Sequence, residues 1–253
     1  MTKLRAFTIH LTASAVVFLA FLSVMLLVWY PGPYFEIDGG WTVLKILISV
    51  DLVLGPLLTL ILFRPGKWGL KFDMACIVVM QLGALLYGGM VIYQQRPAFI
   101  VFVVDRFTTI PTSEIDPAQL KYPELQHPAG TRPFLAQANF PEDPKARQEL
   151  MFAVLGGHAK DIEFHPELYA PYRPDLQHLR TRGIDIQQIM ARGAEAKQAI
   201  ERFVSRQGGR PEDYLYLPLK GKNKDIVLAL SPRDGMPVGF ISISPWLDDY
   251  PAK

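Results

Sequence analysis

An ionisable residue and a helix-disrupting pair lie inside the apolar segment "VDLVLGPLLTL", residues 50–60. Asp51 is the ionisable residue, and Gly55-Pro56 begins four residues after it. If the segment crosses a membrane, a carboxylate near mid-depth costs about 2.5–3.5 kcal/mol on insertion scales. We therefore expect Asp51 to face protein or to be protonated.

Gln81, in a later apolar segment, is the expected partner of Asp51 within the chain. Counting residues inward from the outer ends of the two segments places them at similar depth. Ser23 is a weaker candidate. Lys45 is poorer still, because a long lysine side chain can extend to the membrane surface.

Gly55 and Pro56 change what the helix around Asp51 can do. Gly55 lies one turn from Asp51 on the same face and permits close helix approach. Pro56 has no N–H, so the carbonyl of Leu52 is expected to lose its helical donor. The pattern fits a kinked helix with its polar groups satisfied inside a bundle, or a face that recognises another transmembrane helix. A proton relay is a third reading, weakened because no chain of intramembrane acids continues from Asp51.

Outside this segment, no residues form a catalytic or metal-binding pattern. His158 and His165 lie near Asp161 and Glu163, but their spacing does not place four ligands on one face. No serine nucleophile elbow is present, and "GGHAKD" is not a phosphate loop. The formal charge of +2 is too small to indicate nucleic acid. We expect neither an enzyme nor a cofactor. No metalloprotease motif contains any of the five histidines: His10, His127, His158, His165 and His178.

Three segments of the N-terminal region reach the roughly 20 residues that span a bilayer. They cover about residues 7–30, 41–63 and 74–93. The first is too long for a signal peptide and lacks a cleavage site, so we expect an uncleaved anchor. Basic residues mark the cytoplasmic side, and the loop between the first two segments has none. The N-terminus is then cytoplasmic and everything after Arg96 lies outside. The marking residues are Lys3, Arg5, Arg64, Lys67 and Lys71.

Residues 97–253 have the composition of a globular domain, which we expect to be an α+β fold with a largely antiparallel sheet. The apolar run at 99–107 predicts a central strand. A proline-rich stretch, 111–144, predicts loop with one short helical turn. Helices are expected at 142–157 and, with Asp185 and Gln188 as N-terminal capping residues, at 185–209. The chain should close with an antiparallel meander of strands at 214–219, 226–231 and 238–243.

Four stretches in order resemble a known family. They are "MTKLRAFTIHL", "VWYPGPYFEIDGGW", "VDLVLGPLLTLILFRPGKWGLKFD" and "YQQRPAFIVFVVDRF". Together they resemble the TfpX/TfpZ family of type IV pilin accessory proteins, strongly over about the first 110 residues and in general plan beyond. The resemblance implies an inner-membrane protein that assists pilin assembly and modulates surface piliation or retraction, with the major pilin and the bilayer as partners. It implies no catalytic residue, no cofactor and no small-molecule substrate.

Together these observations divide the chain into a transmembrane region, 1–96, and a periplasmic domain, 97–253. Asp51, Gly55, Pro56 and Gln81 are the residues expected to bind a partner or to shape the bundle. One alternative is a membrane-anchored sensor with a ligand-binding outer domain, although the short cytoplasmic segments offer little output. An envelope enzyme that modifies pilin is another, and the lack of a polar catalytic cluster weighs against it.

Overall fold

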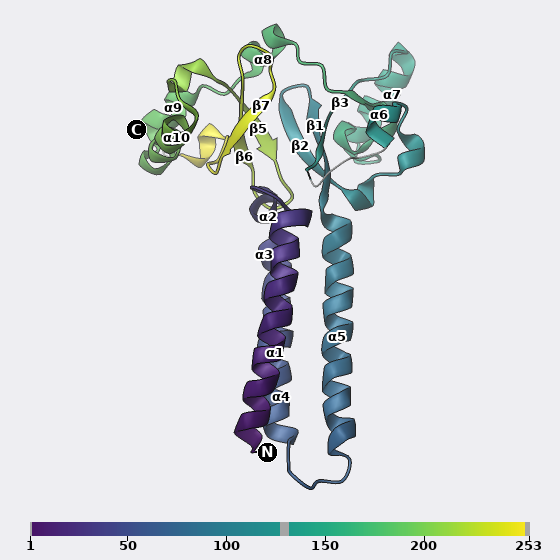
Figure 1. The fold of residues 1–253 in the computed structure, drawn as a ribbon. Coiled ribbons are helices and arrows are strands. Elements are labelled where there is room, and N and C mark those ends of the chain that lie inside the picture. The colour runs from purple at the N-terminus through teal and green to yellow at the C-terminus, as the bar shows by residue number, and fades with distance from the viewer. Residues whose placement is uncertain (1, 127–131, 251–253) are drawn as a thin grey trace. The chain divides into compact units, whose positions relative to one another are not determined.

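The computed structural model describes residues 2–126 and 132–250. They form two compact units that divide between Arg96 and Pro97 (Figure 1). Long apolar helices build the first unit, and a sheet with helices builds the second. The expected fold class, three N-terminal apolar helices followed by an α+β domain with a mostly antiparallel sheet, is confirmed.

Each of the three predicted spans is helical over a length that can cross a membrane. A short helix, α2 (Tyr34–Ile37), follows the first span. Two of the spans change from α-helical to π-helical hydrogen bonding along their length. Their segments are α1 (Lys3–Val24) with η1 (Met25–Trp29), α3 (Gly40–Leu47) with η2 (Ile48–Leu54) and α4 (Gly55–Leu62), and the uninterrupted α5 (Leu70–Gln95).

The π-helical segment η2 changes which carbonyl loses its donor to Pro56. The Gly55 N–H donates to the Val50 carbonyl, five residues back. In this register the donor for the Asp51 carbonyl would be the nitrogen of Pro56, which carries no hydrogen. The expectation that the Leu52 carbonyl is the deprived one assumed an α-helical register. The structure moves that loss to Asp51.

Aromatic contacts join the first and third spans at the end next to α2. The Trp29 ring packs edge-on against Phe21 and Tyr93, with ring centroids 5.7 and 5.4 Å away. The Tyr30 hydroxyl donates to the Ile92 carbonyl at 2.9 Å. These contacts close the bundle at that end.

The second unit is built on one sheet with strand order β4-β3-β1-β2-β5-β6-β7. Of the six pairings among the described strands, β1 with β3 and β2 with β5 are parallel, and the other four are antiparallel. The outer strands, β4 and β7, each contain a proline. The strands are β1 (Pro97–Val103), β2 (Arg106–Pro111), β3 (Phe134–Ala138), β4 (Tyr169–Pro171), β5 (Leu215–Lys220), β6 (Ile226–Leu230) and β7 (Pro237–Ile241).

The predicted strand at 99–107 lies centrally in the sheet but does not run straight through. It divides into β1 and the start of β2, joined by a two-residue turn at Val104 and Asp105. Val104 adopts a φ of 55°, which is unusual for a β-branched residue. His178 Nε2 donates to the Val104 carbonyl at 2.5 Å and so holds the turn.

Two strands lie where the sequence predicted none. Strand β3 lies within the proline-rich stretch, and β4 lies in the segment between the predicted helices. Both are short: the continuous apolar run of β3 covers only Phe134–Ala136, and β4 has three residues in all. The C-terminal antiparallel meander of β5, β6 and β7 is confirmed.

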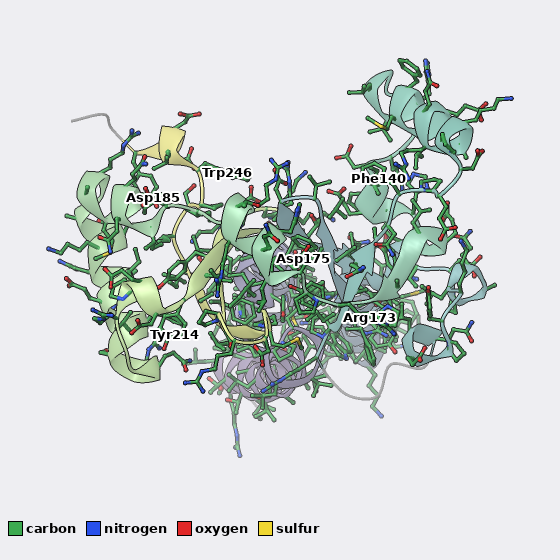
Figure 2. All side chains as sticks on the ribbon, turned by 90° about the horizontal axis from the view of Figure 1, so that it is seen from above. Phe140, Arg173, Asp175, Asp185, Tyr214 and Trp246 are labelled. Carbon is green, nitrogen blue, oxygen red and sulfur yellow. The ribbon has the colours of Figure 1, made fainter. Side chains whose placement is uncertain are left out.

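Several helices of the domain begin directly after a capping aspartate. Asp143 caps α7 (Pro144–Leu155). Asp185, which is labelled in Figure 2, accepts from the N–H groups of Gln187 and Gln188 at the start of α9 (Ile186–Arg192). The single helix predicted at 185–209 is wrong, because the chain is extended at Gly193 before α10 (Ala194–Gln207). A Cβ at Gly193 would lie 2.8 Å from the Tyr250 ring. Two further helices are α6 (Pro123–Gln126) and α8 (Leu176–Arg182).

The domain core includes two clusters on different parts of the sheet. One packs α9 and α10 on β6 and β7 through residues such as Ile189 and Ile200, both fully buried. The other surrounds Phe99 and Tyr169 beside β1 and β3. The Tyr169 hydroxyl donates to the Glu163 carbonyl, and burial raises the pKa of this phenol. Tyr169 therefore stays a neutral donor within the core.

Candidate functional site

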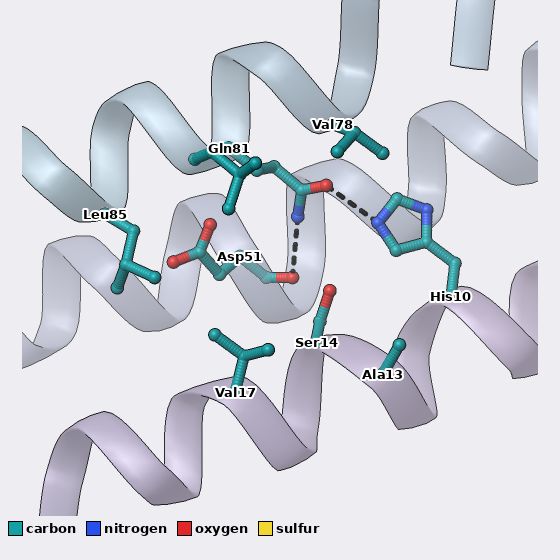
Figure 3. A pocket seen from close by; sticks show the side chains of 9 residues that line it. His10, Ala13, Ser14, Val17, Asp51, Val78, Gln81 and Leu85 are labelled. Carbon is teal, nitrogen blue, oxygen red and sulfur yellow. Dashed lines mark hydrogen bonds between the residues drawn. The ribbon is translucent and has the colours of Figure 1, made fainter. Parts of the chain in front are cut away.

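A chain of hydrogen bonds joins all three spans. His10 of α1 approaches Thr59 of α4, with 2.5 Å between its Nδ1 and the Thr59 Oγ1. Its other ring nitrogen, Nε2, lies 2.7 Å from Oε1 of Gln81 on α5 (Figure 3). We call His10, Thr59 and Gln81 the polar bridge. Because polar side chains in a span are costly when unpaired, such a bridge fixes how the three helices associate.

The Gln81 amide also supplies the hydrogen bond that Pro56 cannot make. Its Nε2 donates to the Asp51 carbonyl at 3.1 Å (Figure 3). That carbonyl is the one left without a donor by the π-helical register and the proline. A side chain of the third span thus completes the backbone hydrogen bonding of the second.

Gly55 makes room for this contact. A Cβ at this position would overlap the Gln81 side-chain amide, so no larger residue fits without displacing it. Pro56 beside it is buried as well. The Thr59 hydroxyl lies 3.2 Å from the Gly55 carbonyl, which ties the polar bridge back to the same turn. Gly55 and Pro56 therefore belong to the interior of the bundle.

The polar bridge is complete whether or not His10 is charged. Since Gln81 Nε2 donates to Asp51, Gln81 Oε1 is an acceptor and His10 Nε2 carries a hydrogen. With neutral His10, its Nδ1 accepts the Thr59 hydroxyl hydrogen. With protonated His10, Nδ1 donates to Thr59, whose hydrogen then turns to the Gly55 carbonyl. Neither state leaves a group of the bridge unpaired.

The Asp51 carboxyl lies away from the bridge, in a cavity of about 160 Å³ between α1 and α5. We call this cavity the window. Figure 3 shows the carboxyl among Val17, Gln81 and Leu85. Asp51 is only 7% exposed, yet among the described residues none donates a hydrogen bond to its carboxyl oxygens. Eight further residues line the window: His10, Ala13, Ser14, Val17, Val78, Gln81, Leu82 and Leu85.

The structure brings together the four residues singled out from sequence, with a different division of roles. Gln81 reaches the backbone carbonyl of Asp51, whereas a contact with its carboxyl was expected. Ser23, the weaker candidate, donates to Leu19 of its own helix. Sequence reasoning missed His10 and Thr59. Both are polar residues inside apolar segments, which was the signal that could have identified them.

Two histidines of the domain serve local contacts. His165 lies 3.0 Å from Glu167, and His178 holds the Val104 turn. In the part of the chain that the structure describes, no cluster of three metal-ligating side chains occurs. His127 lies outside the described residues.

Comparison with known proteins places the chain in a family. A fimbrial assembly protein from Dichelobacter nodosus, serogroup E1, is 30% identical over 218 residues, or 83% of each chain. The chain belongs to the fimbrial assembly protein family. The family model described as fimbrial assembly protein FimB matches residues 1–39. Fimbrial assembly proteins of two other D. nodosus types are similar: serogroup I at 29% over 83% of each chain, and serogroups C1 and C2 at 36% over 42% of this chain and 83% of the relative.

These findings support a role in fimbrial assembly, which is not itself an enzymatic role, and they do not extend to the TfpX/TfpZ name. With three helices able to cross a membrane, the chain is a membrane protein of a fimbrial assembly system. No solved structure matches it.

Proposed function

We propose that this fimbrial assembly protein is an inner-membrane accessory factor for type IV pilin. In this proposal residues 1–96 form a transmembrane unit that contacts the pilin helix, and residues 97–253 form a periplasmic domain. Membership of the fimbrial assembly family is the observation that carries the proposal. The unpaired carboxyl of the buried residue Asp51 supports a partner within the membrane.

The charge distribution along the transmembrane unit supports this orientation. Five basic residues lie before the first span or between the second and third, positions that share one side of a membrane. The only charged residues in the segment between the first two spans are the acids Glu36 and Asp38. Basic loops stay in the cytoplasm. Because three spans separate the cytoplasmic N-terminus from the domain, the domain would then lie in the periplasm.

A protein with this topology can contact pilin at two places. Pilin that awaits assembly has an apolar helix in the inner membrane and a globular head outside it, so the bundle and the periplasmic domain would each meet one part. Two linked contacts raise the effective concentration of the second, so neither needs to be tight. Such a factor would bind pilin before assembly and then release it, and no covalent bond would be made or broken.

Alkaline phosphatase fusions test the topology. The enzyme fused after Lys253 should be active, because it folds in the periplasm, and the enzyme fused after Gly69 should be inactive. Immunoblots must show equal amounts of both fusions. The reverse pattern would place the domain in the cytoplasm and would contradict a periplasmic contact with pilin.

Crosslinking in living cells tests the partner. A short amine-reactive reagent that enters the periplasm should join this protein to pilin, and mass spectrometry should identify the pair. Deletion of the chain should reduce surface pili while pilin itself is still made. Normal piliation in the deletion strain, together with no pilin adduct, would contradict the proposed function.

A further inference from the structure

The window has the form of a receptor for one side chain of a neighbouring helix. Its α1 wall is formed by His10, Ala13, Ser14 and Val17, and its α5 wall by Val78, Gln81, Leu82 and Leu85. Both sets follow the spacing i, i+3, i+4, i+7, so each wall is one continuous helix face about 10 Å long. The polar bridge lies at one end of the window, and the contact of Phe21 with Gly89 lies beyond the other.

The size of the window suits a side chain. Its volume of about 160 Å³ is close to that of an apolar protein cavity of roughly 150 Å³ that binds benzene. A whole helix does not fit in such a space. A helix that lay along the α1 and α5 faces would instead insert one residue, and the small Ala13 and Ser14 would permit its close approach.

The chemistry of the window selects what that side chain must carry. The walls are mostly apolar. Asp51 as a whole residue is 7% exposed, and its carboxyl has no hydrogen-bond donor among the described residues. A lipid chain would fill the space and leave this group unsatisfied, which is costly in an apolar medium. A donor group on the inserted side chain would satisfy it in either protonation state, because a carboxyl always keeps an accepting oxygen.

We infer that the window binds a hydrogen-bond-donating side chain of the pilin transmembrane helix and that the Asp51 carboxyl accepts its hydrogen bond. This inference rests on the proposed function, which supplies pilin as the partner, and adds the place and chemistry of the contact. Asp51 is then the recognition residue. Gly55 and Pro56 shape the helix that carries it, and Gln81 of the third span holds that helix in place.

Photocrosslinking in cells that make native pilin locates the contact. Benzoylphenylalanine is placed at Val17 or Val78, which line the window and are 47% and 48% exposed. Leu57 is the control, because it is 45% exposed on the second span but lies outside the window. Pilin adducts are expected from Val17 and Val78 and not from Leu57.

Substitution of Asp51 tests the hydrogen bond. Asp51→Leu should reduce the adducts about tenfold, and Asp51→Asn, which keeps an accepting oxygen, should stay within about threefold of the native level. Ala13→Leu should block entry, whereas Ala20→Leu makes the same change two turns further along α1, outside the window. All adducts are normalised to the amount of folded protein, so that a loss of protein is not read as a loss of binding.

The outcomes separate this inference from the proposed function. Pilin adducts from Leu57 alone would contradict the window as the binding site for pilin, but pilin would remain the partner. Equal adducts with Asp51→Leu and Asp51→Asn, or adducts to lipid alone from Val17 and Val78, would overturn the role of the carboxyl as recognition group. If no site in the bundle gave pilin adducts and the amine-reactive crosslinks were also absent, the inference and the proposed function would both fail.

Discussion

The transmembrane unit and the domain after Pro97 use the same apolar residue types in opposite ways. In the domain, Leu217 and Leu219 are fully buried in the sheet. In the spans, Leu27 and Leu86 are 72% and 73% exposed, and no more than a third of any span's apolar window is buried. Water drives the leucines of the domain inward. Lipid does not, so helix association must depend on close packing and a few polar contacts.

This difference predicts which substitutions should destabilise each unit. Removing apolar volume should damage the domain, whose core holds it together. The transmembrane unit should instead be sensitive at the few positions where backbones approach or polar groups pair. Gly55 and the polar bridge are such positions. The following predictions test this contrast, starting with the largest expected effect.

Gly55→Leu should prevent the bundle from assembling. The new side chain would occupy the space of the Gln81 amide, so the bonds of Gln81 to Asp51 and His10 would be lost together. We expect the membrane-inserted protein to fall at least about tenfold in abundance by immunoblot, as misfolded protein is degraded.

Gly83→Leu is the matched control for this change. It lies on α5, and a Cβ there meets no atom within 4 Å. Its abundance should stay near native. Comparable loss in both variants would show that bulk on any span is harmful, and the special role of the Gly55 contact would be refuted.

Leu217→Ala should destabilise the domain by about 2–5 kcal/mol, because it leaves a cavity at a fully buried position. Leu155→Ala makes the same change at a residue that is 79% exposed on α7 and should alter stability by less than about 0.5 kcal/mol. Limited proteolysis of the full chain in detergent, with increasing urea, measures both. A domain equally resistant in the two variants would contradict burial as its source of stability.

The polar bridge should contribute a smaller, coupled amount. His10→Ala and Gln81→Leu should each destabilise the bundle by about 1–2 kcal/mol, and the double variant should cost less than the sum by about 0.6 kcal/mol or more. Unfolding of the purified chain by sodium dodecyl sulfate, followed by tryptophan fluorescence, measures this cycle. Strict additivity would show that the two side chains do not interact.

The span positions could be predicted because membrane thickness imposes a length and a composition that the sequence displays directly. Asp51 could be selected for the same reason, since a lone acid in such a segment is unusual. The role of Gln81 could be predicted only in part. Depth counting placed it beside Asp51, but its target, the backbone carbonyl, depends on a π-helical register that the sequence does not reveal.

In the domain, prediction succeeded where the local signal was strong. The capping residue Asp185 and the apolar runs of β5 and β6 are of this kind. It failed where the cause is distant in sequence. The break at Gly193 coincides with the close approach of Tyr250, and the short β4 is a strand only because β3 lies beside it.

The two edges of the sheet have a consequence for the proposed contact with pilin. Strand β4 has only three residues and ends in Pro171, and β7 begins with Pro237. Proline offers no N–H to an incoming strand, and short edges are poor templates for extension. Neighbouring chains therefore find little backbone to pair with. Under the proposed function, the domain would remain at high local concentrations of pilin without joining an aggregate, and it would contact pilin through side chains.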